Sequence, residues 1–295
     1  MASTNPAADA NAAPPATSLT RPAAAADLAW IAAPAVSLRV VDSAAELVAI
    51  SSADPWRVRV TDRGEAMILG RWRDHLPDCA VLALWCDPRR IPVIVADLLS
   101  VAAEQGFEHL IGPLAPESEA SRYREAGLQV TDRVRVMRLD RPVRAEQPGS
   151  PAGVKLRPAR ASDLPAILAL DASCFDPFWR YDSARMEQLM AADRVAVATI
   201  EGTVVGYTLS TLRAGDGGLG RLAVAPAHRR RGIGRALALE AIGWAAGSGA
   251  HSVVLSTQEV NMASRGLYRS IGFRETGDML VVCASGPLAA SGASE

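Results

Sequence analysis

Residues 222–234 read LAVAPAHRRRGIG, and this stretch decides the fold expected of the chain. It joins an apolar run, a proline turn, three consecutive arginines and two glycines, and helical periodicity follows it over residues 234–246. Glycine lets the main chain approach a ligand, and a helix start directs free N–H groups and the positive end of its dipole there. The stretch therefore predicts a strand–turn–helix unit that binds a diphosphate.

The arginines supply the remaining positive charge of this unit. Three neighbouring guanidinium groups cannot all face one ligand, so we expect main-chain donors from Arg230 to Gly234 with one or two guanidinium groups beside them. His228 is expected to be solvated rather than catalytic. A nucleotide-type P-loop is disfavoured because no lysine followed by serine or threonine closes the loop.

Two later features identify a family. Asn261 follows an apolar strand run at residues 251–257, and residues 267–273 read LYRSIGF. Together with the V-x-P-x-x-R-x-x-G-x-G pattern of residues 224–234, in this order, they resemble the GCN5-related N-acetyltransferase (GNAT) family. In outline, the C-terminal half resembles the ribosomal-protein alanine acetyltransferases. The resemblance implies a mixed α/β fold that binds acetyl-CoA, needs no metal, and acetylates a primary amine.

The resemblance also implies roles for single residues. A central strand that splays from its neighbour would offer the main chain of Leu222 and Val224 to the pantetheine arm, as an added strand would. Asn261 would contact CoA, although an asparagine there could equally cap a helix that starts near Met262. The residues expected to bind acetyl-CoA are Leu222, Ala223, Val224, Arg229, Arg230, Arg231, Gly232, Ile233, Gly234, Arg235 and Asn261.

Catalysis needs a neutral amine and a proton for the departing thiolate. Tyr268 matches the family's general acid, and the alternative is a ring packed against the pantetheine. The base stays open, because Ser256 stands where the alanine acetyltransferases carry a glutamate. Other carboxylates considered are Glu259, Asp171, Asp176 and Asp182, and a water chain or selection of the neutral amine would need no single base.

Aromatic residues gather in the loop at residues 174–182, CFDPFWRYD, although the chain is only 5% aromatic. Phe178, Trp179 and Tyr181 could form the wall of an acceptor pocket, while Asp176 or Asp182 attracts a cation. A hydrophobic plug between two helices is the alternative. The acceptor is expected to be a small amine, an amino-sugar conjugate or a protein N-terminus.

The first half of the chain resembles a copy of the second. Residues 121–128 read SRYREAGL and share the Y-R-x-x-G pattern that begins at Tyr268. The copy carries RRIP at residues 89–92 in place of the glycine loop, and Pro92 has no N–H to offer a phosphate. We therefore expect tandem GNAT folds, the first without a working diphosphate site. This architecture resembles that of mycothiol synthase.

Changes in composition and a Pro/Gly-rich break divide the chain into expected domains, a linker and tails. The expected parts are a disordered Ala/Pro-rich tail at residues 1–30, a degenerate GNAT-like domain at 31–140, a Pro/Gly linker at 141–153, a catalytic GNAT domain at 154–284 and a disordered tail at 285–295. In the second domain we expect strands at 154–157 and 219–224, helices at 162–173 and 182–192, and a hairpin of residues 195–200 and 204–212.

Charge and cysteine content exclude several classes of protein. A net charge of −1 argues against nucleic-acid binding, and the N-terminal segment fits neither a signal peptide nor a membrane span. Four cysteines without C-x-x-C spacing favour reduced thiols in a cytoplasmic protein. A monomer and a homodimer are both compatible with the sequence. The alternative function is a CoA-binding regulatory or partner-docking module with little or no catalysis.

Overall fold

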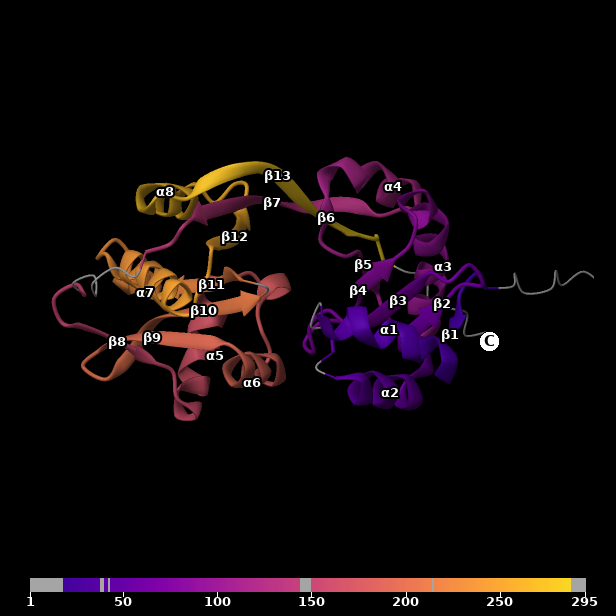
Figure 1. Cartoon of the computed structure of the whole chain (residues 1–295), viewed down its shortest axis with the longest axis horizontal. Helices are drawn as coiled ribbons and strands as arrows, with labels where there is room; N and C mark the ends of the chain where they lie inside the picture. Colours follow the sequence, from indigo (N-terminus) through magenta and orange to yellow (C-terminus); the bar gives the residue numbers. More distant parts are fainter. Residues whose placement is uncertain (1–17, 38–39, 42, 144–149, 214, 288–295) are drawn as a thin grey trace, which may run out of the picture.

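The computed structural model describes residues 18–37, 40–41, 43–143, 150–213 and 215–287, which form two α/β halves joined by one mixed sheet (Figure 1). The first half contains β1 (Arg21–Pro22), α1 (Ala25–Ser37), α2 (Ala44–Ala53), β2 (Val58–Val60), β3 (Ala66–Arg71), β4 (Asp78–Trp85), α3 (Ile91–Glu104), β5 (His109–Ile111), β6 (Ala115–Pro116), α4 (Ala120–Glu125) and β7 (Gln129–Asp140). The second contains β8 (Val154–Pro158), α5 (Leu164–Cys174), α6 (Ser183–Ala192), β9 (Arg194–Ile200), β10 (Thr203–Arg213), β11 (Asp216–Val224), α7 (Ile233–Gly247), β12 (Ser252–Gln258), α8 (Met262–Ile271) and β13 (Arg274–Ala284).

The two halves repeat one fold. In each, an antiparallel hairpin contains a register shift, β3–β4 in the first half and β10–β11 in the second. The second strand of each hairpin then pairs in parallel with the next strand over only three residues, β4 with β5 and β11 with β12. Beyond those pairs the strands separate. The tandem fold predicted from the sequence is therefore confirmed, and the splayed central strand is present in both halves.

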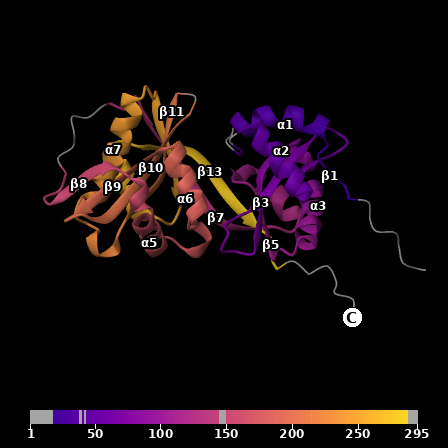
Figure 2. The ribbon, with the colours of Figure 1, turned by 90° about the horizontal axis from the view of Figure 1, so that it is seen from below.

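The last strands of the two halves are exchanged across a single sheet. Its order is β1-β2-β3-β4-β5-β13-β7-β12-β11-β10-β9-β8. β7 belongs to the first half by sequence, but it pairs with β12 of the second half from Val134↔Gln258 to Asp140↔Ser252. β13 reaches the first half, where it pairs with β5 and β6. Figures 1 and 2 show β7 and β13 running side by side between the halves. Each half therefore completes its sheet with a strand from the other.

Two terminal segments predicted to be disordered are folded in part. β1 pairs with β2, and Leu28 and Ile31 of α1 are buried in a core cluster with Leu47. The prediction of a disordered tail up to residue 30 was therefore wrong from residue 21 onward, because the alanine-rich segment forms a helix that buries its few large apolar side chains. Residues 1–17 lie outside the described residues, and so do 144–149 of the predicted linker.

At the other end, Ser285 extends the exchanged strand instead of beginning a tail. Its N–H donates to the Leu110 carbonyl at 2.9 Å, and its hydroxyl accepts from the Leu110 N–H at 2.9 Å. Residues 288–295, the rest of the predicted C-terminal tail, lie outside the described residues.

Local sequence signals place the helices and turns of the second half. The β9–β10 hairpin turns at Glu201 and Gly202, which have φ values of +49° and +84°, as a two-residue turn of the primed type requires. Asp182 caps α6 by accepting the Arg185 N–H, and Asn261 caps α8 by accepting the Ser264 N–H. The predicted elements of this half are confirmed.

An ion pair stabilises the entry into α5 and makes stability depend on pH. The Arg157 guanidinium donates to both oxygens of Asp163, at 2.6 and 2.8 Å, and holds the pKa of that carboxyl at about 2. Because this pKa lies below its unfolded value near 3.8, the stabilisation is complete above about pH 4 and is lost as the pH falls toward 2. Asp163→Asn should lower the free energy of unfolding by about 1 kcal/mol at pH 7.

Urea unfolding of both proteins between pH 7 and pH 2.5 measures this effect. The difference between wild type and variant should shrink across the acid window. A difference that stays constant down to pH 2.5 would show that the ion pair is not its cause.

Three further findings concern membranes, metals and thiols. Among the described residues, no helix combines the length and the apolar composition that crossing a bilayer requires. In the same residues, no three His, Cys, Asp or Glu side chains are grouped as a metal would need. The cysteines Cys79, Cys86, Cys174 and Cys283 are all free thiols.

Candidate active site

A cleft of about 770 Å³ lies in the second half where β11 leaves β12, beside α8 and the first turn of α7. It is lined by ten of the eleven residues predicted to bind acetyl-CoA, namely Leu222, Ala223, Val224, Arg229, Arg230, Gly232, Ile233, Gly234, Arg235 and Asn261. The eleventh, Arg231, does not line it, and its guanidinium lies 3.1 Å from Nδ1 of His228. His228, which was expected to be solvated rather than catalytic, also lines the cleft.

The glycine loop has the conformation that its sequence suggests. Arg230 and Gly232 have φ values of +63° and +79°, and Gly232 directly precedes α7. The N–H groups of the first helical turn have no carbonyl of a preceding turn to bind, so they are free for a ligand. A Cβ on Gly234 would lie 3.5–3.7 Å from the side chains of Leu267, Leu222 and Val224. The glycine therefore keeps open the space between β11 and α8.

No carboxylate of the described residues pairs with the arginines of this loop. Arg229 donates to the Val224 carbonyl at 3.1 Å, and Arg235 donates to the carbonyl and hydroxyl of Ser270 at 3.3 and 3.1 Å. Arg230 makes no hydrogen bond or ion pair to another described residue. Neutral acceptors thus hold the guanidinium groups beside a helix N-terminus, an arrangement that fits a diphosphate.

The corresponding position in the first half is closed. Its helix α3 begins with Ile91, which is buried, and Pro92. The preceding Arg90 is paired with the buried Glu65, Nε to Oε1 at 3.2 Å. The guanidinium therefore has an internal anion, and the helix start lacks a donor at its second residue. These contacts support the predicted absence of a diphosphate site here, which stays a prediction.

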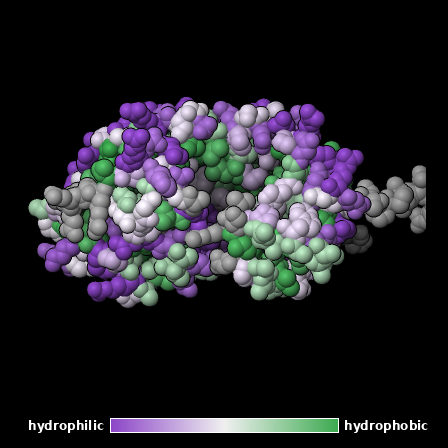
Figure 3. Space-filling model, in the orientation of Figure 1, coloured by the Kyte–Doolittle hydropathy of each residue, from purple (hydrophilic) through white to green (hydrophobic). Residues whose placement is uncertain are grey.

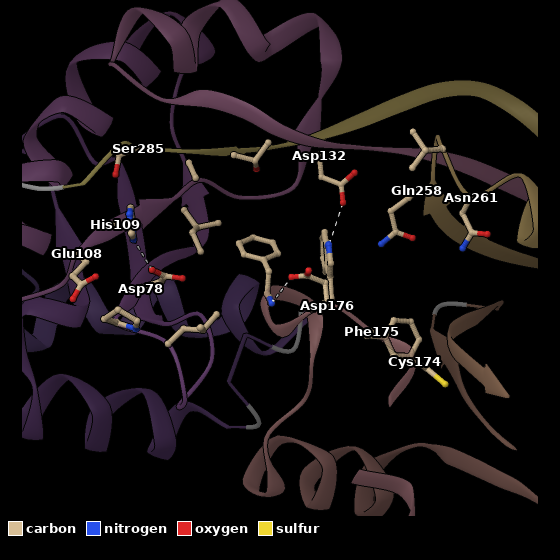
Figure 4. Close-up of a pocket in the computed structure, with 18 residues that line it drawn as sticks. Asp78, Glu108, His109, Asp132, Cys174, Phe175, Asp176, Gln258, Asn261 and Ser285 are labelled. Atoms are coloured by element: carbon tan, nitrogen blue, oxygen red, sulfur yellow. Dashed lines mark hydrogen bonds and ion pairs between the residues drawn. The ribbon is translucent and has the colours of Figure 1, made fainter. Parts of the chain in front are cut away.

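A second cavity, the interdomain pocket, has a volume of about 1020 Å³ and lies between the two halves. Figure 3 shows the surface hollowed between them, and Figure 4 shows the lining side chains. Cys174, Phe175 and Asn261 line both this pocket and the cleft. The two cavities therefore meet at these three residues.

The predicted acceptor loop forms one wall of the interdomain pocket by docking onto the first half. Phe178 and Trp179 line the pocket. The Trp72 indole donates to the Phe178 carbonyl at 2.7 Å and lies against both rings, and the Trp179 indole donates to Asp132 at 3.1 Å. The rings lie at the wall of the cavity, and they pack against Trp72 of the first half rather than between two helices. Their role in acceptor binding stays a prediction.

Two other residues assigned to acceptor binding are not among the residues that line the pocket. Tyr181 does not line the pocket, and its ring lies 4.3 Å from the Arg221 guanidinium. Asp182 does not line it either, because its carboxylate caps α6 at 2.7 Å from the Arg185 nitrogen. Helix capping and a buried cation–π contact therefore account for residues that the sequence offered for substrate binding.

The structure removes most of the carboxylates considered as general base. Asp171 is fully buried and accepts from both Arg221, at 2.9 and 3.0 Å, and Tyr207. Glu259 is paired with Arg135, and Asp182 is the α6 cap. Ser256 lines neither cavity. Asp176 is the remaining one, and it lines the interdomain pocket while accepting the Phe178 N–H at 3.0 Å.

Tyr268 lies beside the cleft rather than among its lining residues. Its side chain is 6% exposed, and its ring meets Phe273 edge-on at 5.7 Å, whereas the preceding Leu267 lines the cleft. Burial raises the pKa of the Tyr268 phenol to about 12, so the hydroxyl is protonated at neutral pH. Asn261 both caps α8 and lines the cleft.

The first half contributes polar side chains that the sequence did not point to. Asp78, Glu108, His109 and Asp132 line the interdomain pocket, and Asp78 Oδ1 lies 2.9 Å from His109 Nδ1. No local motif marks them, because the pocket that they line exists only where the two halves meet.

Comparisons with known proteins agree with this geometry. The sequence profile of the Acetyltransferase (GNAT) family matches residues 164–273. A mycothiol acetyltransferase from Thermobispora bispora is 32% identical over 168 residues, which cover 50% of this chain and 56% of that protein. The chain spans between 26% and 56% of the length of the curated relatives that it matches.

Two solved structures share the fold over most of the chain. A GCN5-related N-acetyltransferase from Sphaerobacter thermophilus has a TM-score of 0.62 at 20% identity and covers 91% of this chain and 95% of its own. A tandem GNAT protein from the clavulanic acid biosynthesis pathway has a TM-score of 0.62 at 18% identity, covering 80% and 83%. Residues 164–273 therefore match the acetyltransferase (GNAT) family, and the chain shares the fold of these two solved structures.

Proposed function

We propose that this chain transfers the acetyl group of acetyl-CoA to a primary amine, by direct attack within a ternary complex. The observation that carries the proposal is the junction at Cys174, Phe175 and Asn261, where the cleft and the interdomain pocket meet. Two substrates held in the two cavities would bring their reacting ends together there. The match to the GNAT family supports the acetyl-transfer chemistry.

Acetyl-CoA would bind along the cleft. The first turn of α7 and the guanidinium groups of Arg229 and Arg230 would hold the diphosphate. Residues 222–224 of β11 lie beyond its last pair with β12, so no strand pairs with them on that side. The pantetheine arm would bind there as an added strand, in place of the Arg229 and Cys174 side chains that now donate to the Val224 carbonyl. When bound, acetyl-CoA supplies the thioester carbonyl that is attacked and the thiolate that leaves.

The junction favours the neutral amine that the reaction needs. Cys174, Phe175, Gln258 and Asn261 line this end of the pocket, and none of them is a carboxylate, a lysine or an arginine. Partial desolvation lowers the pKa of an amine, and Asp176, which follows Phe175 and lines the same pocket, is the nearest candidate in sequence to accept its proton. The reaction forms a C–N bond, breaks the thioester C–S bond, and transfers one proton overall from nitrogen to sulfur. The Tyr268 phenol is proposed as the proton donor to sulfur.

Tyr268→Phe tests that role. Loss of a general acid should slow acetyl transfer by about a hundredfold. Affinity for acetyl-CoA should stay unchanged, because the variant keeps the ring and its contact with Phe273. Single-turnover acetylation, measured beside acetyl-CoA titration, separates the two effects. Tyr123→Phe, at the corresponding buried position of the first half, is the matched control and should leave transfer unchanged. Equal transfer rates for wild type and Tyr268→Phe across pH would remove the assignment.

Calorimetric titration of acetyl-CoA, followed by an assay of amine-dependent CoA release, tests the proposed function. One site per chain and release that depends on a primary amine are expected. Two sites would show that the first half also binds the cofactor. Binding without release for any amine would favour the alternative, a CoA-binding regulatory or partner-docking module.

A further inference from the structure

We propose that the interdomain pocket selects a small di- or polyamine, an acceptor whose second positive charge lies at a distance from the reacting nitrogen. The inference rests on the proposed function, because the reacting nitrogen is placed at the junction with the cleft. Four carboxylates line the pocket, Asp78, Glu108, Asp132 and Asp176, and among the described residues no lysine or arginine lines it. A cation would therefore enter a cavity of uncompensated negative charge.

The contacts of these carboxylates leave their charge in place. Asp132 accepts from the Trp179 indole and a main-chain N–H, and Asp176 accepts from a main-chain N–H. Among the described residues, the Asp78 carboxylate has the His109 ring as its polar partner, and Glu108 is exposed. Elsewhere in the protein, carboxylates near arginines are neutralised by them, as Glu65 is by Arg90. The pocket carboxylates are thus available to a ligand.

Aromatic rings in the same cavity point to a cation independently of the carboxylates. Phe175, Phe178 and Trp179 line the pocket, and Trp72 holds the Phe178 ring at a centroid distance of 5.0 Å. Aromatic faces attract ammonium groups through their quadrupole. The carboxylates favour an ammonium group, and the rings favour an ammonium group together with the methylene segments beside it. The pocket therefore favours a cationic acceptor over an anionic or a neutral polar one.

The distribution of charge along the pocket separates the two ends of the acceptor. Figure 4 shows Asp78, Glu108 and His109 at one end, Asp132 and Asp176 between, and the uncharged Gln258, Asn261 and Cys174 at the other. The uncharged end adjoins the cleft and favours a neutral amine, whereas the acidic end favours an ammonium. An acceptor with two separated amines satisfies both ends at once. The volume of about 1020 Å³ suits a small molecule.

Three probes of equal chain length test the inference on the full-length protein. They are 1,7-diaminoheptane, heptylamine and 7-aminoheptanoic acid, which differ only in carrying a positive, a neutral or a negative far end. Calorimetry in the presence of CoA measures their binding, and acetylated product measures turnover with acetyl-CoA. We expect the diamine to bind at least tenfold more tightly than heptylamine and the amino acid to bind most weakly, with differences that shrink as salt rises.

Charge-neutral variants locate the effect. Asp78→Asn and Glu108→Gln should each reduce the preference for the diamine over heptylamine by about fivefold and leave heptylamine and acetyl-CoA binding unchanged. Glu104→Gln, which removes an exposed carboxylate that does not line the pocket, is the control and should have no effect.

The outcomes separate this inference from the proposed function. Equal binding of diamine and heptylamine, or a preference that survives both variants, overturns the inference even if amines are acetylated. Charge-selective binding without acetylated product from any probe supports the selective pocket and overturns the proposed function instead.

Discussion

Gly232→Asp should weaken acetyl-CoA binding by about a thousandfold. The residue directly precedes α7 and lines the cleft at the expected diphosphate site. A carboxylate about 4 Å from a phosphate charge costs about 4 kcal/mol at the effective dielectric of a protein surface, which corresponds to that loss of affinity. Calorimetric titration of acetyl-CoA into the variant measures it.

A matched variant separates charge at the cleft from backbone strain. Gly232 has a φ of +79°, so any side chain there is strained. Gly249, just beyond the C-terminal end of α7, has a φ of +85° and open space around it. Gly249→Asp carries the same strain away from the cleft, and it should bind acetyl-CoA as wild type does. Wild-type affinity in Gly232→Asp would refute the diphosphate site.

The second half expressed alone, as residues 150–295, should fail to form a stable monomer. It would lose β7, the partner of β12 over seven register pairs. It would also expose Val281 and Cys283 of β13, which are buried in the core of the first half. An unpaired strand edge beside exposed apolar side chains favours aggregation. Thermal melting followed by circular dichroism, with size-exclusion chromatography, should show no cooperative monomeric transition.

Supplying the missing strand is the control for that experiment. Coexpression with residues 1–143, which contain β7, should restore a cooperative transition in a one-to-one complex. A fragment of residues 150–295 that unfolds cooperatively as a monomer on its own would show that the exchange is dispensable, with β13 folding back onto β12.

The cleft was largely predictable from sequence because its signals are local. The proline turn, arginines and glycines of residues 226–234 set the backbone that precedes α7, and ten of the eleven predicted binding residues line one cavity. Arg231 does not line that cavity, because adjacent side chains on a turn diverge, and no spacing rule tells which one faces the ligand.

The interdomain pocket was predictable only in part. Phe178 and Trp179 were conspicuous in an aromatic-poor chain, and they line it. Asp171 and Asp182 were equally conspicuous as carboxylates, but a buried ion pair with Arg221 and a helix cap occupy them. Whether a carboxylate is free depends on its partner, and Arg221 lies fifty positions from Asp171 in sequence.

The sequence by itself determined the repeated fold, the strand–turn–helix cleft, the β9–β10 hairpin and the caps of α6 and α8, because each depends on main-chain geometry within a few residues. Only the tertiary structure decided the exchange of β7 and β13, and with it the meeting of Asp78 and His109 with the Phe178 loop. These strands pair although more than a hundred positions separate them in sequence. The burial of apolar faces across the whole fold sets that pairing, so no local sequence pattern predicts it.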